Sequence, residues 1–376
     1  MAGIYIHIPF CKQACYYCDF HFSTSLKNKK PFIAALIKEI ELQRNYIHHS
    51  EIINTIYFGG GTPSLLTKDE LAIILEQIYK HFNISNSAEI TLEANPDDLT
   101  PEKLNDLKST SVNRLSIGIQ SFFNEDLKWM NRAHTAGQAS MVVKNAQDKG
   151  FENITIDLIY GTPTLSNQNW EENLQKAFDL KVNHISAYCL TIEPKTVLGH
   201  RLKNKTTEQI DEQKSATQFE KMLEQMRKNN FVQYEISNFC IGHNYSRHNS
   251  NYWLQQNYLG LGPSAHSFNG SSRRWNIANN ALYIKALENN MIDYTEEVLT
   301  KEQQYNEYML TSLRTLWGAD LMYIEEKFGK QIIDYCMKEA QPHLLNSNLI
   351  QQNHKLFLTD KGKLLADKIT SDFFFC

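Results

Sequence analysis

Three cysteines near the N-terminus have the spacing of a metal-binding loop. They lie within eight residues, as Cys11-Lys-Gln-Ala-Cys15-Tyr-Tyr-Cys18, directly after the apolar segment GIYIHI. Three thiolates can hold three irons of a [4Fe–4S] cubane, whereas electron-transfer ferredoxins supply four. The fourth iron is then open as a Lewis-acid position for a chelating substrate. The trio therefore predicts a cluster on Cys11, Cys15 and Cys18.

A structural zinc site is the alternative for the same loop. Cys11, Cys15, Cys18 and His21 make a Cys3His set of the kind that holds zinc tetrahedrally. Disulfides explain the loop less well, because the chain is long, its seven cysteines are an odd number and four of them are scattered. The zinc alternative would make the protein a scaffold that only binds partners.

Apolar and amphipathic segments alternate through the first half of the chain. Thr100 before Pro101 marks a helix start, and Gly150 marks a helix end. Six β/α units in series predict a parallel sheet. The predicted strands are 3–8, 53–58, 88–94, 114–120, 154–160 and 184–190, and the predicted helices are 31–47, 68–82, 101–109, 137–149 and 169–181.

The ends of these strands carry residues that are unsuited to a core. In (β/α) barrels the active site is assembled at the C-terminal ends of several strands. We therefore expect an α/β fold with a partial (β/α)6 barrel over residues 1–200 and one shared site at its strand ends. The strand-end residues are Cys11, Gly59 to Gly61, Glu93, Gln120 and Asp157.

Two further regions follow the barrel. Residues 201–300 read as a linking region, with a polar helix at 207–230 and then a loop-rich stretch. Residues 301–376 show helices, a hairpin and a closing helix, which predicts a helical, winged-helix-like C-terminal domain. This domain has no excess of basic residues for DNA phosphates, and the net charge is −4, so we expect no nucleic-acid partner.

The location is expected to be cytoplasmic. The first residues do not resemble a secretory signal, and no apolar run reaches the roughly 18 residues of a membrane span.

Five short motifs accompany the cysteine loop: YIHIPFC at 5–11, GGGTP at 59–63, EANP at 93–96, SIGIQSF at 116–122 and DLIYGTP at 157–163. Together they resemble the radical S-adenosylmethionine family and, within it, the coproporphyrinogen-oxidase-like branch. The resemblance implies that the methionine part of S-adenosylmethionine chelates the open iron. One electron from the cluster would then cleave the sulfonium and give a 5′-deoxyadenosyl radical.

Carried over residue by residue, the resemblance implies a cofactor site around the cluster. Taken singly, the glycines of GGGTP are also typical of a strand-to-helix turn. The charged residues Glu93, Arg132 and Asp157, taken singly, are also typical of surface ion pairs. The residues expected near the cluster or the methionine part are Tyr5, Tyr17, Gly60, Gly61 and Thr62, where glycine lets the backbone approach closely. Those corresponding to residues that bind S-adenosylmethionine are Glu93, Gln120, Arg132 and Asp157.

Three features favour the HemW-type heme chaperones over the oxygen-independent coproporphyrinogen III oxidases. The oxidases continue the trio with a fourth cysteine, where this sequence has Phe20. They also have an N-terminal arm, whereas this chain enters its first strand at Gly3. Finally, residues 248–253 match the HNxxYW motif of the chaperones.

The HNxxYW segment also carries side chains suited to heme. Imidazole is a common axial ligand of heme iron, and aromatic rings offer flat apolar surface. The ordinary interpretation is a hairpin with loop histidines and core tryptophans. His266 in GPSAHS is an alternative iron ligand, and Trp275 a further ring. The expected heme residues are His248, Asn249, Tyr252 and Trp253.

The resemblance thus implies heme binding and delivery to an acceptor hemoprotein, with the cluster and S-adenosylmethionine as cofactors. A respiratory hemoprotein is one candidate acceptor, and membrane contact would then be peripheral. A monomer and a homodimer are both compatible with the sequence. The runner-up function is oxidative decarboxylation of coproporphyrinogen III.

Overall fold

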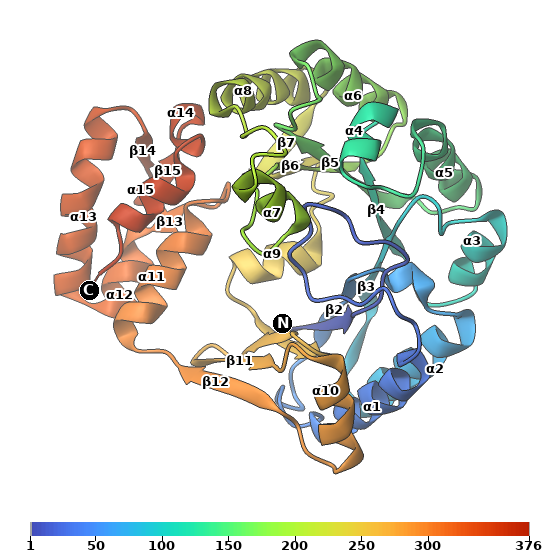
Figure 1. Cartoon of the computed structure of the whole chain (residues 1–376). Coiled ribbons are helices and arrows are strands. Elements are labelled where there is room, and N and C mark those ends of the chain that lie inside the picture. Colours follow the sequence, from blue (N-terminus) through green and yellow to red (C-terminus); the bar gives the residue numbers. More distant parts are fainter. Residues whose placement is uncertain (1, 376) are drawn as a thin grey trace.

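Six parallel strands follow one another around a curved sheet, with connecting helices on its outside (Figure 1). The computed structural model describes residues 2–375, so Met1 and Cys376 lie outside it. The predicted (β/α)6 partial barrel is confirmed. Its strands are β1 (Ala2–Ile8), β2 (Ile53–Gly60), β3 (Ile84–Ala94), β4 (Arg114–Gln120), β5 (Asn153–Tyr160) and β6 (His184–Cys189). Its helices are α1 (Lys29–Leu42), α2 (Lys68–His81), α3 (Pro101–Lys108), α4 (Asn124–Trp129), α5 (Ala136–Asp148) and α6 (Asn167–Asp179).

Local capping sets the ends of these helices. Helix α3 begins as predicted, because Thr100 Oγ1 accepts a hydrogen bond from Lys103 N (3.2 Å) and Pro101 occupies the first turn. Helix α2 begins with a reciprocal capping box between Thr67 and Glu70. Just past α5, Gly150 has φ +80°, which a residue with a side chain rarely adopts.

Residues 201–300 differ from the expected linking region, because they extend both edges of the barrel sheet. Strand β9 pairs in parallel with β1, and β8 pairs antiparallel with β6, giving a 12-stranded sheet. These pairings join segments distant in sequence, so local patterns did not reveal them. The added elements are α7 (Val197–Lys203), α8 (Glu212–Lys228), β7 (Phe231–Glu235), β8 (Asn238–Ile241), α9 (Arg247–Trp253), β9 (Asn257–Leu261), β10 (His266–Phe268), β11 (Ser272–Asn276), α10 (Asn280–Glu288) and β12 (Tyr294–Val298).

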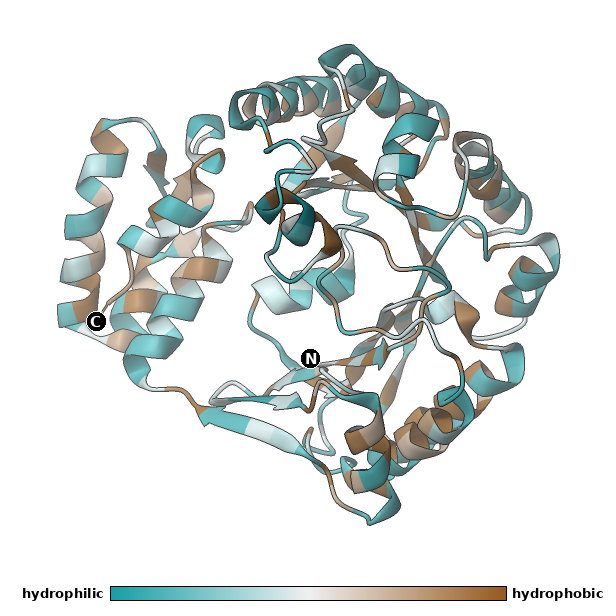
Figure 2. Ribbon diagram, in the orientation of Figure 1, coloured by the Kyte–Doolittle hydropathy of each residue, from teal (hydrophilic) through white to brown (hydrophobic). Residues whose placement is uncertain are grey.

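The C-terminal region has a hydrophobic core of its own, drawn from residues 305–373. The barrel has a separate core. Hydrophobic residues run along its strands, and hydrophilic residues cover much of the surrounding helices (Figure 2). Three helices, a hairpin and a closing helix occur in the predicted order, together with the two-residue strand β13 and the four-residue helix α14. They are α11 (Lys301–Ser312), β13 (Ala319–Asp320), α12 (Leu321–Phe328), α13 (Lys330–Leu345), β14 (Leu349–Gln352), β15 (Lys355–Leu358), α14 (Asp360–Lys363) and α15 (Ala366–Asp372).

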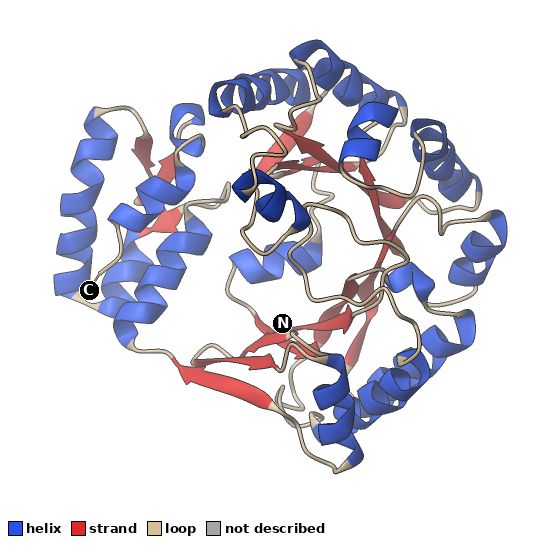
Figure 3. Cartoon of the chain, viewed as in Figure 1, coloured by secondary structure: helices blue, strands red, loops and turns tan. Residues whose placement is uncertain are grey.

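The C-terminal domain packs beside the open side of the barrel (Figure 3). Ion pairs join it to both edge regions of the sheet. On one side Arg273 of β11 pairs with Glu307 of α11 at 2.9 Å, and on the other Glu235 of β7 pairs with Arg314 at 3.3 Å. The domain therefore bridges the gap that the partial barrel leaves. Within residues 2–375, no helix is long and apolar enough to cross a membrane.

A buried carboxylate joins the added strands to the barrel. Glu39 on α1 accepts hydrogen bonds from the Gly262 backbone (2.7 Å), Asn276 Nδ2 (2.6 Å) and the Tyr283 hydroxyl (2.6 Å). Burial raises the pKa of Glu39 to about 7, although these three hydrogen bonds favour the charged form.

Replacing Glu39 with glutamine is expected to lower the free energy of unfolding by about 1–3 kcal/mol, because an amide group then faces N–H donors. The folded wild type binds a proton at Glu39 more tightly than the unfolded chain does. Its stability should therefore fall by up to about 3 kcal/mol between pH 4.5 and 7 on account of this group.

Urea unfolding of both proteins at several pH values measures the two effects. The variant should show the shallower pH dependence, since the titrating group is gone. Equal slopes for variant and wild type would show that Glu39 does not titrate in this window.

Candidate cluster and cofactor site

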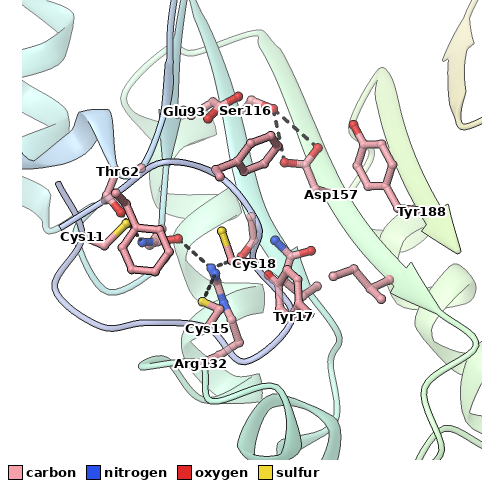
Figure 4. A pocket seen from close by; sticks show the side chains of 18 of the residues that line it. Cys11, Cys15, Tyr17, Cys18, Thr62, Glu93, Ser116, Arg132, Asp157 and Tyr188 are labelled. Atoms are coloured by element: carbon pink, nitrogen blue, oxygen red, sulfur yellow. Dashed lines mark hydrogen bonds between the residues drawn. The ribbon is translucent and has the colours of Figure 1, made fainter. Parts of the chain in front are cut away.

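A pocket of about 380 Å³ opens at the C-terminal ends of the barrel strands. Strands β3, β4, β5 and β6 contribute side chains to its wall, β2 contributes Gly60 at its end, and the cysteine loop after β1 covers one side (Figure 4). This is where the barrel interpretation placed a shared site. Eleven of the residues singled out from the sequence line it: Cys11, Cys15, Tyr17, Cys18, Gly60, Gly61, Thr62, Glu93, Gln120, Arg132 and Asp157.

Backbone hydrogen bonds anchor the cysteine loop at both ends. Cys11 N donates to Ser23 O (3.0 Å) and Ser23 N to Pro9 O (2.9 Å), which closes the base of the loop. Farther along, Tyr16 N donates to Met130 O at 3.1 Å, in the loop between α4 and α5. These anchors do not use the cysteine side chains, so the thiols remain available for ligands.

The three thiols line the same pocket, which fits the donor set of a cluster with one open iron. Burial raises the pKa of Cys11 to about 11 and that of Cys18 to about 12, so binding of a metal must displace their protons. Within the described chain, no three His, Cys, Asp or Glu side chains are already arranged to hold a metal ion. His21 does not join the thiols, because its Nε2 is hydrogen bonded to Asn280 Oδ1 at 2.7 Å.

Arg132 occupies the centre of the site (Figure 4). Its guanidinium donates to Cys15 Sγ (3.2 Å), Asn95 Oδ1 (2.6 Å) and the Gly118 carbonyl (2.8 Å). The positive charge therefore lies directly beside the cysteine loop and faces the pocket. It can balance thiolate charge and the carboxylate of a bound ligand.

Two half-buried carboxylates lie deeper in the pocket. Tyr57 donates to Glu93 Oε1 at 2.7 Å, and Ser116 donates to the Asp157 oxygens at 3.4 and 3.5 Å. Burial raises the pKa of Glu93 to about 7 and that of Asp157 to about 6, and the Asp157 charge raises that of Glu93 further. Such carboxylates favour a ligand that is cationic or rich in hydroxyl groups.

Beneath the pocket, aromatic rings form a second layer. Tyr57 stacks on His248 with ring centroids 4.9 Å apart, and Tyr5 lies within 6.3 Å of both rings. Tyr5 does not itself line the pocket; its hydroxyl is hydrogen bonded to His7 Nδ1 (3.2 Å). This layer packs against the ring of Tyr57, and the Tyr57 hydroxyl in turn positions the Glu93 carboxylate.

The HNxxYW segment forms helix α9, where the sequence indicated a loop-rich stretch. Ser246 caps this helix, and Glu89 of β3 accepts hydrogen bonds from the Arg247 and His248 backbone (3.2 and 3.1 Å). The helix is thus tethered near the N-terminal ends of the barrel strands. None of the motif residues that we singled out, His248, Asn249, Tyr252 and Trp253, lines the pocket.

Both ring nitrogens of His248 are hydrogen bonded. Nδ1 pairs with Thr55 Oγ1 and Nε2 with the Tyr252 hydroxyl, each at 2.8 Å, and the side chain is 1% exposed. Trp253 lies at the other end of α9, where the guanidinium carbon of Arg314 is 5.6 Å from the centroid of its ring. The motif thus connects the layer beneath the pocket with the C-terminal domain.

Sequence reasoning missed several pocket residues. Asn95 and Ser116 stand inside the motifs EANP and SIGIQSF, next to residues that were selected. Tyr188 and Cys189 end the sixth strand, so the strand-end argument could have reached them. Phe20, 70% exposed at the pocket mouth, was noted only for replacing a cysteine.

Two family models match the chain. The model of the radical SAM superfamily matches residues 5–177, and that of the HemN C-terminal domain matches residues 299–365. The fold is similar to that of coproporphyrinogen III oxidase (HemN) from Escherichia coli, a radical SAM enzyme. The TM-score is 0.86 at 21% identity, covering 99% of this chain and 90% of that one. At this identity the match shows the fold alone.

Curated relatives match over nearly the whole chain. The heme chaperone HemW of Lactococcus lactis is 35% identical over 98% of this chain and 96% of its own length. That of Bacillus subtilis is 33% identical over 99% of both chains. The cofactors of the radical SAM superfamily are a [4Fe–4S] cluster and S-adenosylmethionine. The chain belongs to the HemW family of radical SAM proteins.

Proposed function

We propose that Cys11, Cys15 and Cys18 hold the cluster and that the rest of the pocket binds S-adenosylmethionine. Three thiols on one anchored loop support the first part. The glycines Gly60 and Gly61 support the second, since both line the pocket and, without a Cβ, let a ligand approach the backbone closely. Tyr17, Thr62, Glu93, Gln120, Arg132 and Asp157 complete the proposed cofactor site.

We further propose that the protein is a heme chaperone that binds heme and passes it to an acceptor hemoprotein. The observation that carries this proposal is the nearly full-length similarity to relatives named heme chaperone HemW. The proposed heme region includes the motif residues on α9, His248, Asn249, Tyr252 and Trp253. We place the delivery in the cytoplasm, with respiratory hemoproteins as candidate acceptors and membrane contact only through them.

A comparison of two substrates tests this function. Anaerobically reconstituted full-length protein, supplied with S-adenosylmethionine and a reductant, is incubated with coproporphyrinogen III, and porphyrin products are analysed by chromatography. We expect no protoporphyrinogen, whereas ferric heme added to the same protein without the reductant should give a Soret band. The bound heme should then pass to an apo-hemoprotein. Turnover of coproporphyrinogen on the order of 1 s⁻¹ would instead make the protein an oxidase.

A further inference from the structure

A group of residues outside the cofactor pocket has the properties of a heme-binding surface. It lies on β9, β10 and β11, the strands that residues 201–300 add beside β1. We name this surface the inner annex face and define it by Tyr258, His266, Phe268, Arg273 and Trp275.

The strand register places these five side chains on one face of the sheet. His266 is paired with Trp275, Phe268 with Arg273, and Phe268 also with Tyr258. Directly paired residues point to the same side of a sheet, and neighbours along a strand point to opposite sides. The residue after Trp275 agrees with this orientation, because Asn276 on β11 points to the other side, where it donates to Glu39 of α1.

The inner annex face therefore looks into the partial barrel, toward helix α9. Tyr252 of the HNxxYW motif packs edge-on against Tyr258, with ring centroids 4.5 Å apart. Tyr5, on the adjacent strand β1, pairs in register with Gly260. The face is thus continuous with the aromatic layer beneath the cofactor pocket.

His266 is available as a ligand, in contrast to His248. Its side chain is exposed, and neither ring nitrogen has a hydrogen-bond partner in the part of the chain that the structure describes. Trp275 stacks on the imidazole, with ring centroids 6.0 Å apart and an interplanar angle of 25°, and this restricts the orientation of the imidazole. Partial desolvation of the ring and the nearby Arg273 charge lower the pKa of His266, which favours the neutral imidazole that binds a metal.

The remaining requirements of heme are met nearby. A porphyrin presents a wide apolar surface and two anionic propionates. The half-buried rings of Tyr258 and Tyr252 supply aromatic surface. Arg273 is 40% exposed and uses one nitrogen for Glu307, which leaves other N–H groups for a carboxylate.

We propose that His266 is an axial ligand of heme iron, that the inner annex face binds the porphyrin, and that Arg273 pairs with a propionate. This inference rests on the proposed function. Trp275 acts as a positioning residue for the imidazole. His248 then contributes indirectly, because it holds the hydroxyl of Tyr252 at the edge of this face.

Titration of the full-length protein with ferric heme, followed at the Soret band, tests this assignment. His266→Ala is expected to shift the band and weaken heme binding by at least about tenfold, because a metal ligand is lost. Added imidazole should restore the band. His266→Gln should behave like the alanine variant, since it keeps a polar side chain of similar length but has no imidazole.

His243→Ala is the matched control, because His243 is also exposed but follows β8, toward the opposite edge of the sheet from His266. It should bind heme as the wild type does. Circular dichroism and cluster iron content check that each variant is folded. If wild-type protein binds heme and both His266 variants keep its band and affinity, the assignment of His266 is overturned while the proposed function stands. If the wild type does not bind heme, the proposed function itself fails.

Discussion

Replacing Cys15 with serine is expected to remove most of the cluster iron and sulfide while leaving the barrel folded. Three thiolates close the proposed site, and a serine hydroxyl is a poor substitute for a soft sulfur ligand of an iron–sulfur cluster. The loop should keep its shape, because Cys11 N, Tyr16 N and Ser23 N anchor it through backbone hydrogen bonds. Iron and sulfide analysis after anaerobic reconstitution measures the effect.

Cys189→Ser is the matched control for this experiment. Cys189 lines the same pocket and is exposed, but it belongs to β6 and not to the loop. The control variant should retain the brown absorbance of the wild type. A full complement of iron and sulfide in Cys15→Ser would show that the cluster is held elsewhere.

Replacing Glu93 with glutamine is expected to weaken binding of S-adenosylmethionine by about 1.5–3 kcal/mol, because a charged hydrogen bond is lost in a buried pocket. That corresponds to a roughly ten- to hundredfold higher dissociation constant. Cluster iron should not change, since Glu93 is not a proposed cluster ligand. Equilibrium dialysis with radiolabelled S-adenosylmethionine on reconstituted protein measures the dissociation constant.

Tyr57→Phe is a milder change at the same carboxylate, and its effect on the affinity for S-adenosylmethionine is compared with that of Glu93→Gln. It removes only the 2.7 Å hydrogen bond to Glu93 and leaves the carboxylate in place, so the loss should be about 1 kcal/mol. An affinity unchanged by Glu93→Gln would exclude the carboxylate from the cofactor site.

The affinity of the wild type should also rise with pH through the range of about 6 to 7. The pKa values of Asp157 and Glu93 in the ligand-free protein are raised by burial to about 6 and about 7. Above this range both groups are charged and attract the cationic sulfonium of the cofactor. In Glu93→Gln the rise should be smaller and should reflect Asp157 alone.

The sequence predicted the barrel well because its signals are local. Thr100 and Pro101 act within one helical turn, Glu93 and Gln120 lie at the ends of β3 and β4, and Asp157 lies in the C-terminal half of β5. Once the strands are parallel neighbours, those ends meet at one edge of the sheet. The cysteine loop needed no tertiary information at all.

The heme region was harder to predict because its geometry depends on distant residues. The match to the HNxxYW motif singled out His248 and did not indicate that Thr55, 193 positions earlier, would be hydrogen bonded to its ring nitrogen. The pairing of β9 with β1 likewise joins residues that no local pattern connects. His266 and His248 look equally suitable in the sequence, and only their partners in the fold distinguish them.

The measurement that tests the central claim most directly is a heme titration of the anaerobically reconstituted full-length protein. Heme is added in steps to protein of known concentration, and the Soret band is recorded with and without S-adenosylmethionine. A heme chaperone is expected to give a single band that saturates near one heme per chain, without any porphyrin product. A titration indistinguishable from that of buffer containing an equal concentration of a heme-free control protein would contradict it.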